Sequence, residues 1–378
     1  MIEFQSVTKR YPDGTVAVDA LDLAIEDGGI TVLVGPSGCG KTTSLRMINR
    51  MVDPSEGTVL IDGRDVRAQS PSALRRGIGY VIQNAGLFPH RTVLDNVATV
   101  PVLTGTGKAA ARKRAAELLE TVGLPAAFAK RYPAQLSGGQ QQRVGVARAL
   151  AADPPVLLMD EPFSAVDPIV RDDLQEELLR LQSELGKTIV FVTHDIDEAI
   201  KLGDKVAVLR VGGRLAQFDT PSALLANPVD DFVASFVGRD RGYRALGFLP
   251  GHGVPVGPVP SVPVGTAVDT ARGQLTDGWA VVVDDAKRPL GWVSADLLSS
   301  SGDAVSAENL ISGGSLYSVD AESGGTSGSL RNALDAALSS PSGVGIAVDS
   351  GGAVVGGITA DTVIAALAEA RRSGEVPT

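Results

Sequence analysis

The sequence predicts an α/β fold that is followed by a second, smaller α/β domain. Three observations lead to this prediction: short apolar runs alternate with helical patterns, a glycine-rich loop joins the first run to a helix, and a β-turn-β unit occurs twice near the C-terminus. With 378 residues, 44% of them hydrophobic, the chain is long enough for two or three domains with their own cores.

Four apolar runs are typical of β-strands, and three of them are almost continuously apolar. Strands of that composition are expected in a parallel sheet that helices cover on both faces. The four runs occupy residues 30–35, 155–162, 188–195 and 205–215.

The first run leads into "GPSGCGKTT", residues 35–43, which has the spacing of a phosphate-binding loop. Its glycines allow the backbone to wrap phosphates, its lysine reaches the terminal phosphates, and the threonine after it offers a hydroxyl to Mg²⁺. These residues are Gly35, Gly38, Gly40, Lys41 and Thr42. Cys39 is the only cysteine, which excludes an internal disulfide; we expect it to pack passively, with redox control as the alternative.

Two carboxylates end the second run, in "VLLMDEPFSAVD". Asp160 is expected to hold Mg²⁺, and Glu161, which points to the opposite side, to act as the general base toward water. His194 ends the third run, and beside a phosphate loop we interpret it as a sensor of the γ-phosphate rather than a structural histidine.

A helix start is predicted in "QLSGGQQQRVGVARAL", residues 135–150, where Ser137 is a good N-cap. Val144, Ala147 and Leu150 then follow at spacings of three. Such a helix N-terminus presents free backbone N–H groups and the positive end of the dipole, which favours an anion.

With these pieces in place, residues 1 to about 240 resemble the ATP-binding subunit of an ABC transporter. "GPSGCGKTT" is similar to the Walker A motif of that family, "VLLMDE" to Walker B, "SAVD" to the D-loop, "THD" to the switch around His194 and "LSGGQQQR" to the signature. The resemblance implies a P-loop ATPase cassette with a helical signature subdomain, and ATP and Mg²⁺ as cofactors.

The resemblance also assigns roles to single residues. Tyr11 would stack on adenine, and Gln83, in the Q-loop, would act in catalysis with Glu161 and His194 and hold Mg²⁺ with Thr42 and Asp160. The loop residues that would bind ATP are Gly35, Pro36, Ser37, Gly38, Cys39, Gly40, Lys41, Thr42 and Thr43. Cassettes of the family pack head to tail, so the resemblance implies a homodimer in which the signature completes the site of the neighbour through Ser137, Gly138, Gly139 and Gln140.

Transport is the function that the resemblance implies, since Lys41 and Ser137 are only 96 positions apart, too close for the long coiled coil of chromosome-handling relatives. Residues 83–97 resemble the surface that grips an integral membrane permease. Residues 78–105, 195–209 and 232–242 look most like importers of glycine betaine, carnitine, choline or proline, which work with a solute-binding protein. The alternatives are the ATPase of an amino-acid or polyamine importer and a soluble ATPase without a transport role.

The charge is unevenly distributed along the chain. Of the net charge of −10, residues 247–378 carry −8, because they hold 6 basic and 14 acidic residues. That sign opposes binding to nucleic acid or to anionic lipid. The N-terminal sequence lacks the pattern of a signal peptide and no apolar run could cross a bilayer, so we expect a soluble chain that reaches the cytoplasmic side of the membrane through its permease.

The C-terminal part is predicted to be a degenerate pair of CBS-like modules. Residues 280–298 align without gaps on residues 345–363, and each unit runs strand, turn, strand and helix. The expected division is a cassette over 1–240, a Gly/Pro-rich linker over 241–265, repeats over 266–302 and 329–370, and a linker over 303–328. Residues 315–329 are expected to form a flexible loop.

Nucleotide-binding CBS modules place Ser or Thr three residues before the ribose-binding Asp. Here Ser294 and Thr359 lie only two before Asp296 and Asp361, which puts a ligand in doubt. A small regulatory ligand, pairing with a second tail and a purely stabilising role therefore stay open.

Overall fold

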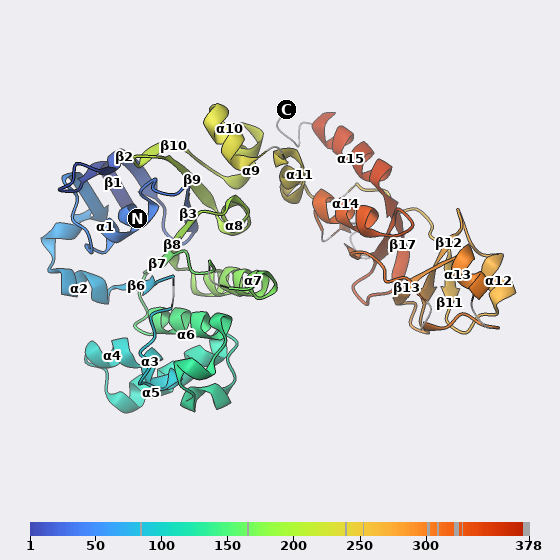
Figure 1. Ribbon diagram of the computed structural model, residues 1–378, viewed down its shortest axis with the longest axis horizontal. Helices are drawn as coiled ribbons and strands as arrows, with labels where there is room; N and C mark the ends of the chain where they lie inside the picture. The colour runs from blue at the N-terminus through green and yellow to red at the C-terminus, as the bar shows by residue number, and fades with distance from the viewer. Residues whose placement is uncertain are drawn as a thin grey trace. The chain divides into compact units, whose positions relative to one another are not determined.

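The computed structural model describes residues 1–83, 85–164, 166–238, 240–251, 253–300, 303–307, 310–320, 325–326 and 328–372. The chain divides into two compact units, Met1–Val237 and Gly238–Thr378 (Figure 1).

Two sheets form the first unit. One is antiparallel with the order β2-β1-β4-β5; the other has the order β10-β9-β3-β8-β7-β6 and is parallel except for β10. Their strands are β1 (Ile2–Arg10), β2 (Val16–Ile25), β3 (Ile30–Val34), β4 (Glu56–Ile61), β5 (Arg64–Asp65), β6 (Ile78–Val81), β7 (Val156–Asp160), β8 (Thr188–Thr193), β9 (Lys205–Arg210) and β10 (Arg214–Asp219).

Ten α-helices and three short 3₁₀ turns accompany these sheets in the described part of this unit. The helices are α1 (Lys41–Ile48), α2 (Pro71–Arg76), α3 (Val93–Val97), α4 (Thr99–Leu103), α5 (Lys108–Thr121), α6 (Gly138–Leu150), α7 (Pro168–Leu185), α8 (Ile196–Leu202), α9 (Pro221–Ala226) and α10 (Asp231–Val237). The 3₁₀ turns are η1 (Val66–Ala68), η2 (Ala126–Lys130) and η3 (Pro133–Gln135).

The main core of this unit lies between the two sheets and around α1. Fully buried side chains from β1 and β2 meet those of β3, β7, β8 and β9 there, among them Ile2, Leu21, Leu33, Leu158 and Val192. Helices α3 to α6 pack on one another and form a helical subdomain, at the labels α3 to α6 in Figure 1.

The predicted strands are present, with one difference. The apolar runs at 30–35, 155–162 and 188–195 contain β3, β7 and β8, but the run at 205–215 is a hairpin of β9 and β10 rather than one strand. The chain turns at Gly212 and Gly213, whose φ angles of +86° and +70° suit glycine. The helix predicted from Ser137 is α6, and Val144, Ala147 and Leu150 are buried on it.

The second unit contains two small sheets with the orders β11-β12-β13 and β15-β14-β16-β17. Its strands are β11 (Ser261–Pro263), β12 (Trp279–Val283), β13 (Pro289–Ser294), β14 (Tyr317–Asp320), β15 (Gly325–Thr326), β16 (Val344–Val348) and β17 (Val354–Thr359). Its helices are α11 (Arg241–Ala245), α12 (Val268–Arg272), α13 (Ala295–Ser300), α14 (Leu330–Ser339) and α15 (Ala360–Arg372), with the 3₁₀ turn η4 (Leu246–Phe248).

The repeat is visible in the boundaries of these elements. Strands β12 and β13 begin and end 65 positions before β16 and β17, and α13 begins 65 positions before α15. A helix precedes each half, α12 before the first and α14 before the second. Apolar residues from both halves meet in one cluster, which contains Val281 and Trp292 from the first and Ile346 and Val348 from the second.

Two segments predicted as linkers contain packed structure instead. Residues 241–265 include α11, η4 and β11, and Val262 is fully buried because β11 pairs with β12 in parallel. The flexible loop predicted over 315–329 includes β14, whose Tyr317 is fully buried beside β16. Residues 301–302, 308–309, 321–324 and 327 of the predicted repeat and linker lie outside the described residues.

Among the described residues, none of the helices has the length and apolar character that crossing a membrane requires.

Candidate active site

An open pocket of about 500 Å³ lies where β3 passes into α1. The loop between them forms one side, Ala17 of β2 adds to it, and Glu161 and His194 lie in the lining with them. Glu161 follows β7 and His194 follows β8, and the carboxyl ends of parallel strands meet at one edge of a sheet, where ligands bind. The loop residues in the lining are Ser37, Gly38, Cys39, Gly40, Lys41, Thr42 and Thr43.

Two glycines of the loop are required by close contact with neighbouring backbone. A Cβ on Gly40, which has a φ of +85°, would lie 2.2 Å from the carbonyl oxygen of Ala17. A Cβ on Gly35 would lie 2.4 Å from the carbonyl oxygen of Leu209. Side chains at these positions would push the loop away from β2 and β9, so the glycines also hold it against the sheets.

Lys41 is buried and connects the two ends of the loop. Its Nζ donates to the carbonyl oxygens of Gly35, at 2.8 Å, and Pro36, at 3.2 Å. Cys39 is fully buried beside it, and burial raises the pKa of the Cys39 thiol. A thiol in this state is a poor nucleophile, which favours passive packing of Cys39 over redox control.

Asp160, the last residue of β7, is the centre of a polar cluster. Its Oδ1 accepts a hydrogen bond from Thr42 Oγ1 at 2.8 Å, and its Oδ2 accepts one from Tyr80 OH at 3.2 Å. Arg46 Nη2 lies 3.6 Å from the same Oδ2. Burial and the charge of Asp160 raise the pKa of Tyr80, so its phenol stays a neutral donor.

The pair of Thr42 and Asp160 fits Mg²⁺ bound together with a nucleotide. Both supply hard oxygen ligands on one side, and Mg²⁺ in such sites takes its other ligands from phosphates and water. Among the described residues, no group of three or more His, Cys, Asp or Glu side chains could hold a metal ion. The protein therefore offers part of a coordination shell, which phosphate oxygens would have to complete.

Glu161 and His194 form a direct contact, with 3.2 Å between Glu161 Oε2 and His194 Nδ1. The backbone of Glu161 has a φ of +46°, in the left-handed region that side chains other than glycine rarely adopt. Its N–H donates to the carbonyl oxygen of Val192 at 3.0 Å, which ties the end of β7 to β8. This conformation turns the Glu161 side chain into the pocket while Asp160 faces Thr42.

Gln83 and Tyr11 lie outside the lining of this pocket. Gln83 Nε2 donates to Ser164 Oγ at 3.1 Å, and Ser164 Oγ donates to the carbonyl oxygen of Glu161 at 2.9 Å. Gln83 therefore connects to the segment after Glu161 rather than to Thr42 or Asp160. Tyr11 follows β1, is 37% exposed and lies under Lys9 Nζ, which is 5.3 Å from the ring centroid.

The signature residues also lie outside the pocket of their own chain. Ser137 Oγ accepts from the N–H of Gln140 at 3.3 Å, and the Gln140 side chain accepts from the N–H of Ser137 at 3.0 Å. This capping box begins α6 and leaves Ser137 and Gly138 exposed. Gly139 is buried, and a Cβ on it would lie 2.6 Å from Val170 Cγ1.

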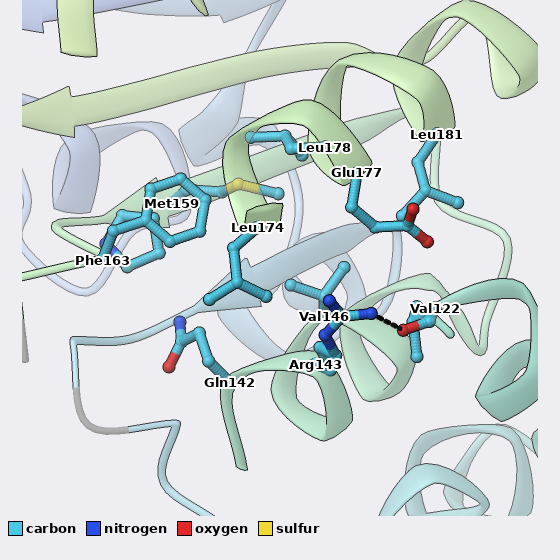
Figure 2. Close-up of a pocket in the computed structure, with 11 residues that line it drawn as sticks. Val122, Gln142, Arg143, Val146, Met159, Phe163, Leu174, Glu177, Leu178 and Leu181 are labelled. Atoms are coloured by element: carbon cyan, nitrogen blue, oxygen red, sulfur yellow. Dashed lines mark hydrogen bonds between the residues drawn. The ribbon is translucent and has the colours of Figure 1, made fainter. Parts of the chain in front are cut away.

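A second, apolar pocket lies between α6 and α7, close to the end of β7 (Figure 2). Arg143 lines it and donates from Nη1 to the carbonyl oxygen of Val122 at 2.9 Å. The buried Nε2 of Gln142 is without a hydrogen-bond partner among the described residues. The pocket has a volume of about 20 Å³, which is enough for one water molecule but not for a nucleotide.

In the second unit, two hydroxyls at positions similar to those of nucleotide-binding CBS modules act as helix caps. Ser294 Oγ accepts from the N–H of Leu297 at 3.3 Å, at the start of α13. Thr359 Oγ1 accepts from the N–H of Thr362 at 3.3 Å, at the start of α15. The capping role accounts for both residues without a ligand.

Sequence reasoning missed three residues around the site: Arg46, Tyr80 and Ser164. Arg46 could have been found, because it lies one helical turn after Thr42 and shares its face of α1. Tyr80 and Ser164 carry no local signal, because their contacts depend on β6 lying beside β7 and on the path of the chain after Glu161. Ala165 of the D-loop motif lies outside the described residues.

Comparison with known protein families finds one match, to the ABC transporter family, over residues 18–164. The chain is 53% identical to the carnitine transport ATP-binding protein OpuCA of Listeria monocytogenes over 241 residues, 64% of this chain and 60% of that protein. It therefore spans about three fifths of the length of that relative. It is 47% identical to the osmoprotectant import ATP-binding protein OsmV of Salmonella typhimurium over 303 residues, 78% of this chain and 79% of that protein.

A solved structure is similar to the first unit. The dimeric structure of a post-hydrolysis state of the ATP-binding cassette MJ0796, bound to ADP and Pi, matches with a TM-score of 0.54 and 37% sequence identity. The match covers 58% of this chain and 99% of the other.

Proposed function

This chain belongs to the ABC transporter family, and on that premise we propose that it is the ATP-hydrolysing subunit of an importer of osmoprotectants such as glycine betaine, carnitine, choline or proline. The observation that carries the hydrolytic part of the proposal is the placement of Glu161 and His194 in the lining of the phosphate-loop pocket, directly beside the Thr42 and Asp160 pair. The class of solute is proposed from the 47% identity to the osmoprotectant import ATP-binding protein OsmV.

ATP binds along the phosphate loop, with its adenine on Tyr11. The N-terminus of α1 and the loop N–H groups favour the phosphates, and the partial exposure of Tyr11 supports the stacking role. Lys41 Nζ already has two carbonyl partners, so it would exchange at least one of them for a phosphate oxygen when ATP binds.

Mg²⁺ supplies charge neutralisation at the phosphates when it is bound, and Thr42 and Asp160 are the residues that would hold it. Gln83 joins them only if it leaves Ser164, its present partner. Tyr80 and Arg46 hold the other oxygen of Asp160 in place.

Glu161 takes a proton from the attacking water. The water oxygen forms a bond to the γ-phosphorus, the bond from that phosphorus to the bridging oxygen of ADP breaks, and the water proton moves to the Glu161 carboxylate. His194, in contact with Glu161, orients it and lies near the same end of the pocket, where it can contact the γ-phosphate.

The signature completes the site of a second copy of this chain. Ser137, Gly138, Gly139 and Gln140 begin a long helix outside their own pocket, and Ser137 and Gly138 are exposed. The similar cassette MJ0796 is dimeric with ADP and Pi. A head-to-tail homodimer would place the amides and the hydroxyl of one signature at the γ-phosphate of the other chain.

The membrane permease docks on the helical subdomain, in a groove of about 390 Å³ that α3, α4 and α5 form near residues 83–97. Leu103 is 73% exposed on its rim and Val102 42%, so apolar surface is available there. The groove is lined by Arg91, Asp95, Ala98, Thr99, Val102, Leu103, Lys108 and Arg112. A solute-binding protein on the other side of the membrane would be an indirect partner.

The second unit is a CBS-like tandem that regulates the cassette. The repeated β-β-α halves and the cluster that joins them support this assignment. The hydroxyls of Ser294 and Thr359 cap helices, so pairing with the tail of a second chain is favoured over a nucleotide bound between the halves. Binding assays with the purified chain test for a small regulatory ligand.

The test begins with hydrolysis and ends with transport. The purified chain should hydrolyse ATP in the presence of Mg²⁺, Lys41→Ala should not, and Lys113→Ala, an exposed lysine of α5, should behave as the parent. The membrane protein that co-purifies should then be reconstituted with the chain in proteoliposomes and assayed for ATP-dependent uptake of betaine, carnitine, choline and proline. Uptake of none of these solutes, or co-purification with ribosomes, would contradict the proposal.

A further inference from the structure

The two residues that flank His194, Thr193 and Asp195, are connected to a buried carboxylate that the hydrolytic step does not use. Glu198, on α8, is 6% exposed, and its Oε2 accepts a hydrogen bond from Thr193 Oγ1 at 2.6 Å. The same Thr193 Oγ1 accepts from the N–H of Asp195 at 3.0 Å. His194 stands between these two residues, so the turn that carries its imidazole is held on both sides.

Arg171, on α7, connects that turn to the segment after Glu161. Its Nη2 donates to the carbonyl oxygen of Val166 at 3.3 Å, and its Nη1 lies 3.9 Å from Asp195 Oδ2. Its Nε, which is buried without a hydrogen bond among the described residues, lies 3.9 Å from Glu198 Oε1. The Arg171 guanidinium thus contacts the backbone that follows the proposed base Glu161, and it lies near the carboxylates of Asp195 and Glu198 beside His194.

The position of Glu198 could serve stability alone, because Gln175 of α7 also reaches it, with its Nε2 at 3.4 Å from Oε1. A second ion pair between the same two helices can distinguish a role in stability from a role in positioning His194. Lys201 Nζ and Asp172 Oδ1 join the same two helices at 2.8 Å, but at the surface, where Asp172 is 72% exposed, and neither is bonded to the His194 turn.

We propose that Glu198 and Arg171 are positioning residues for hydrolysis. They fix the turn of His194 relative to the segment after Glu161, and so keep the imidazole in contact with the Glu161 carboxylate. This inference rests on the proposed ATPase activity of the chain. A shift of the imidazole by about 1 Å is enough to lower the rate by on the order of a hundredfold in positioned sites.

The test compares Glu198→Gln and Arg171→Lys with Asp172→Asn in the full chain. Glutamine keeps the shape of Glu198 but loses the charge opposite Arg171, and lysine keeps the charge of Arg171 but cannot span three partners. We expect kcat to fall by about tenfold to a hundredfold in both variants, with the dissociation constant for ATP near that of the parent and the thermal midpoint not below it. Asp172→Asn should match the parent in all three measurements.

A readout independent of turnover is the NMR signal of the His194 ring, identified by its loss in His194→Ala. It should move in Glu198→Gln and Arg171→Lys and stay in place in Asp172→Asn, while the signal of His90 stays in all variants. An unmoved His194 signal, or a parental kcat in Glu198→Gln, would overturn the inference. So would a loss of ATP affinity and thermal stability in step with kcat, which indicates a structural role. A parent chain that does not hydrolyse ATP would refute the proposed function instead, and the His194 signal would still decide the positioning role.

Discussion

Glu161 Oε2 lies 3.2 Å from His194 Nδ1, although the two residues follow different strands and are separated by 33 positions. Their strands, β7 and β8, are neighbours in the parallel sheet, and the N–H of Glu161 bonds to the carbonyl oxygen of Val192, two residues before His194. The sheet itself therefore brings the two side chains together before any ligand is bound.

Replacing Glu161 by Gln should leave ATP binding intact and slow hydrolysis by on the order of 10² to 10⁴-fold, because only the proton acceptor is lost. The amide can still contact His194 and does not disturb Thr42 or Asp160. The measurement is single-turnover hydrolysis beside equilibrium binding of ATP. Hydrolysis near the parental rate would remove Glu161 from the role of base.

The head-to-tail arrangement can be tested by mixing two inactive chains. Ser137→Arg inactivates the signature and Lys41→Ala inactivates the phosphate loop, so each homodimer lacks an intact composite site. A mixed dimer has one, formed by Lys41 of the first chain and Ser137 of the second. ATPase activity should therefore reappear on mixing. If mixed dimers form and stay inactive, the signature does not act across the interface.

The stability of the chain should depend on pH through Glu198. Burial, the largest cause, raises the pKa of this carboxyl above its ordinary value of 4.5. A raised pKa in the folded state means that Glu198 favours folding while it is protonated, and that this contribution is lost as the pH rises through the folded-state pKa. Glu198→Gln cannot ionise, so its thermal midpoint relative to the parent should increase as the pH rises above about 4.5. A relative midpoint that falls over this range would contradict the burial effect.

The cassette should fold and hydrolyse ATP when the chain ends at Val237, where the first compact unit ends. A chain that ends at Leu246 should be less soluble, since Tyr243 and Leu246 belong to the apolar cluster of the second unit and would be exposed. Yield of soluble monomer and ATPase rate, measured for both lengths and the full chain, check this. An inactive 1–237 chain would show that the cassette needs the second unit.

The elements nearest the ligand could be predicted because their signals are local. The loop from Gly35 to Thr43, the cap at Ser137 and the two carboxylates at the end of β7 each depend on a few adjacent residues. Tyr80, Arg171 and Glu198 could not be found in this way. Their contacts arise from strand order and from side chains that meet between α7 and α8, and no short spacing in the sequence carries that information.

Composition misled the prediction where long-range pairing decided the structure. The segment 241–265 is rich in Gly and Pro, yet Val262 enters a parallel pair with β12, and Pro263 is tolerated because it ends a short edge strand. Tyr317 lies in a Ser/Gly-rich stretch and is buried only because β14 meets β16. At 205–215 the apolar pattern continues through Val211 and concealed the turn that Gly212 and Gly213 mark.

The left-handed backbone of Glu161 places stability and turnover in competition at one position. A side chain held in that region costs about 1 to 3 kcal/mol, which glycine does not incur and asparagine incurs less. Laboratory selection for heat resistance alone would therefore favour Gly or Asn at position 161 and enrich proteins that have lost their base. A thermostable engineered form of this chain has to gain its stability elsewhere and keep the glutamate under selection for activity.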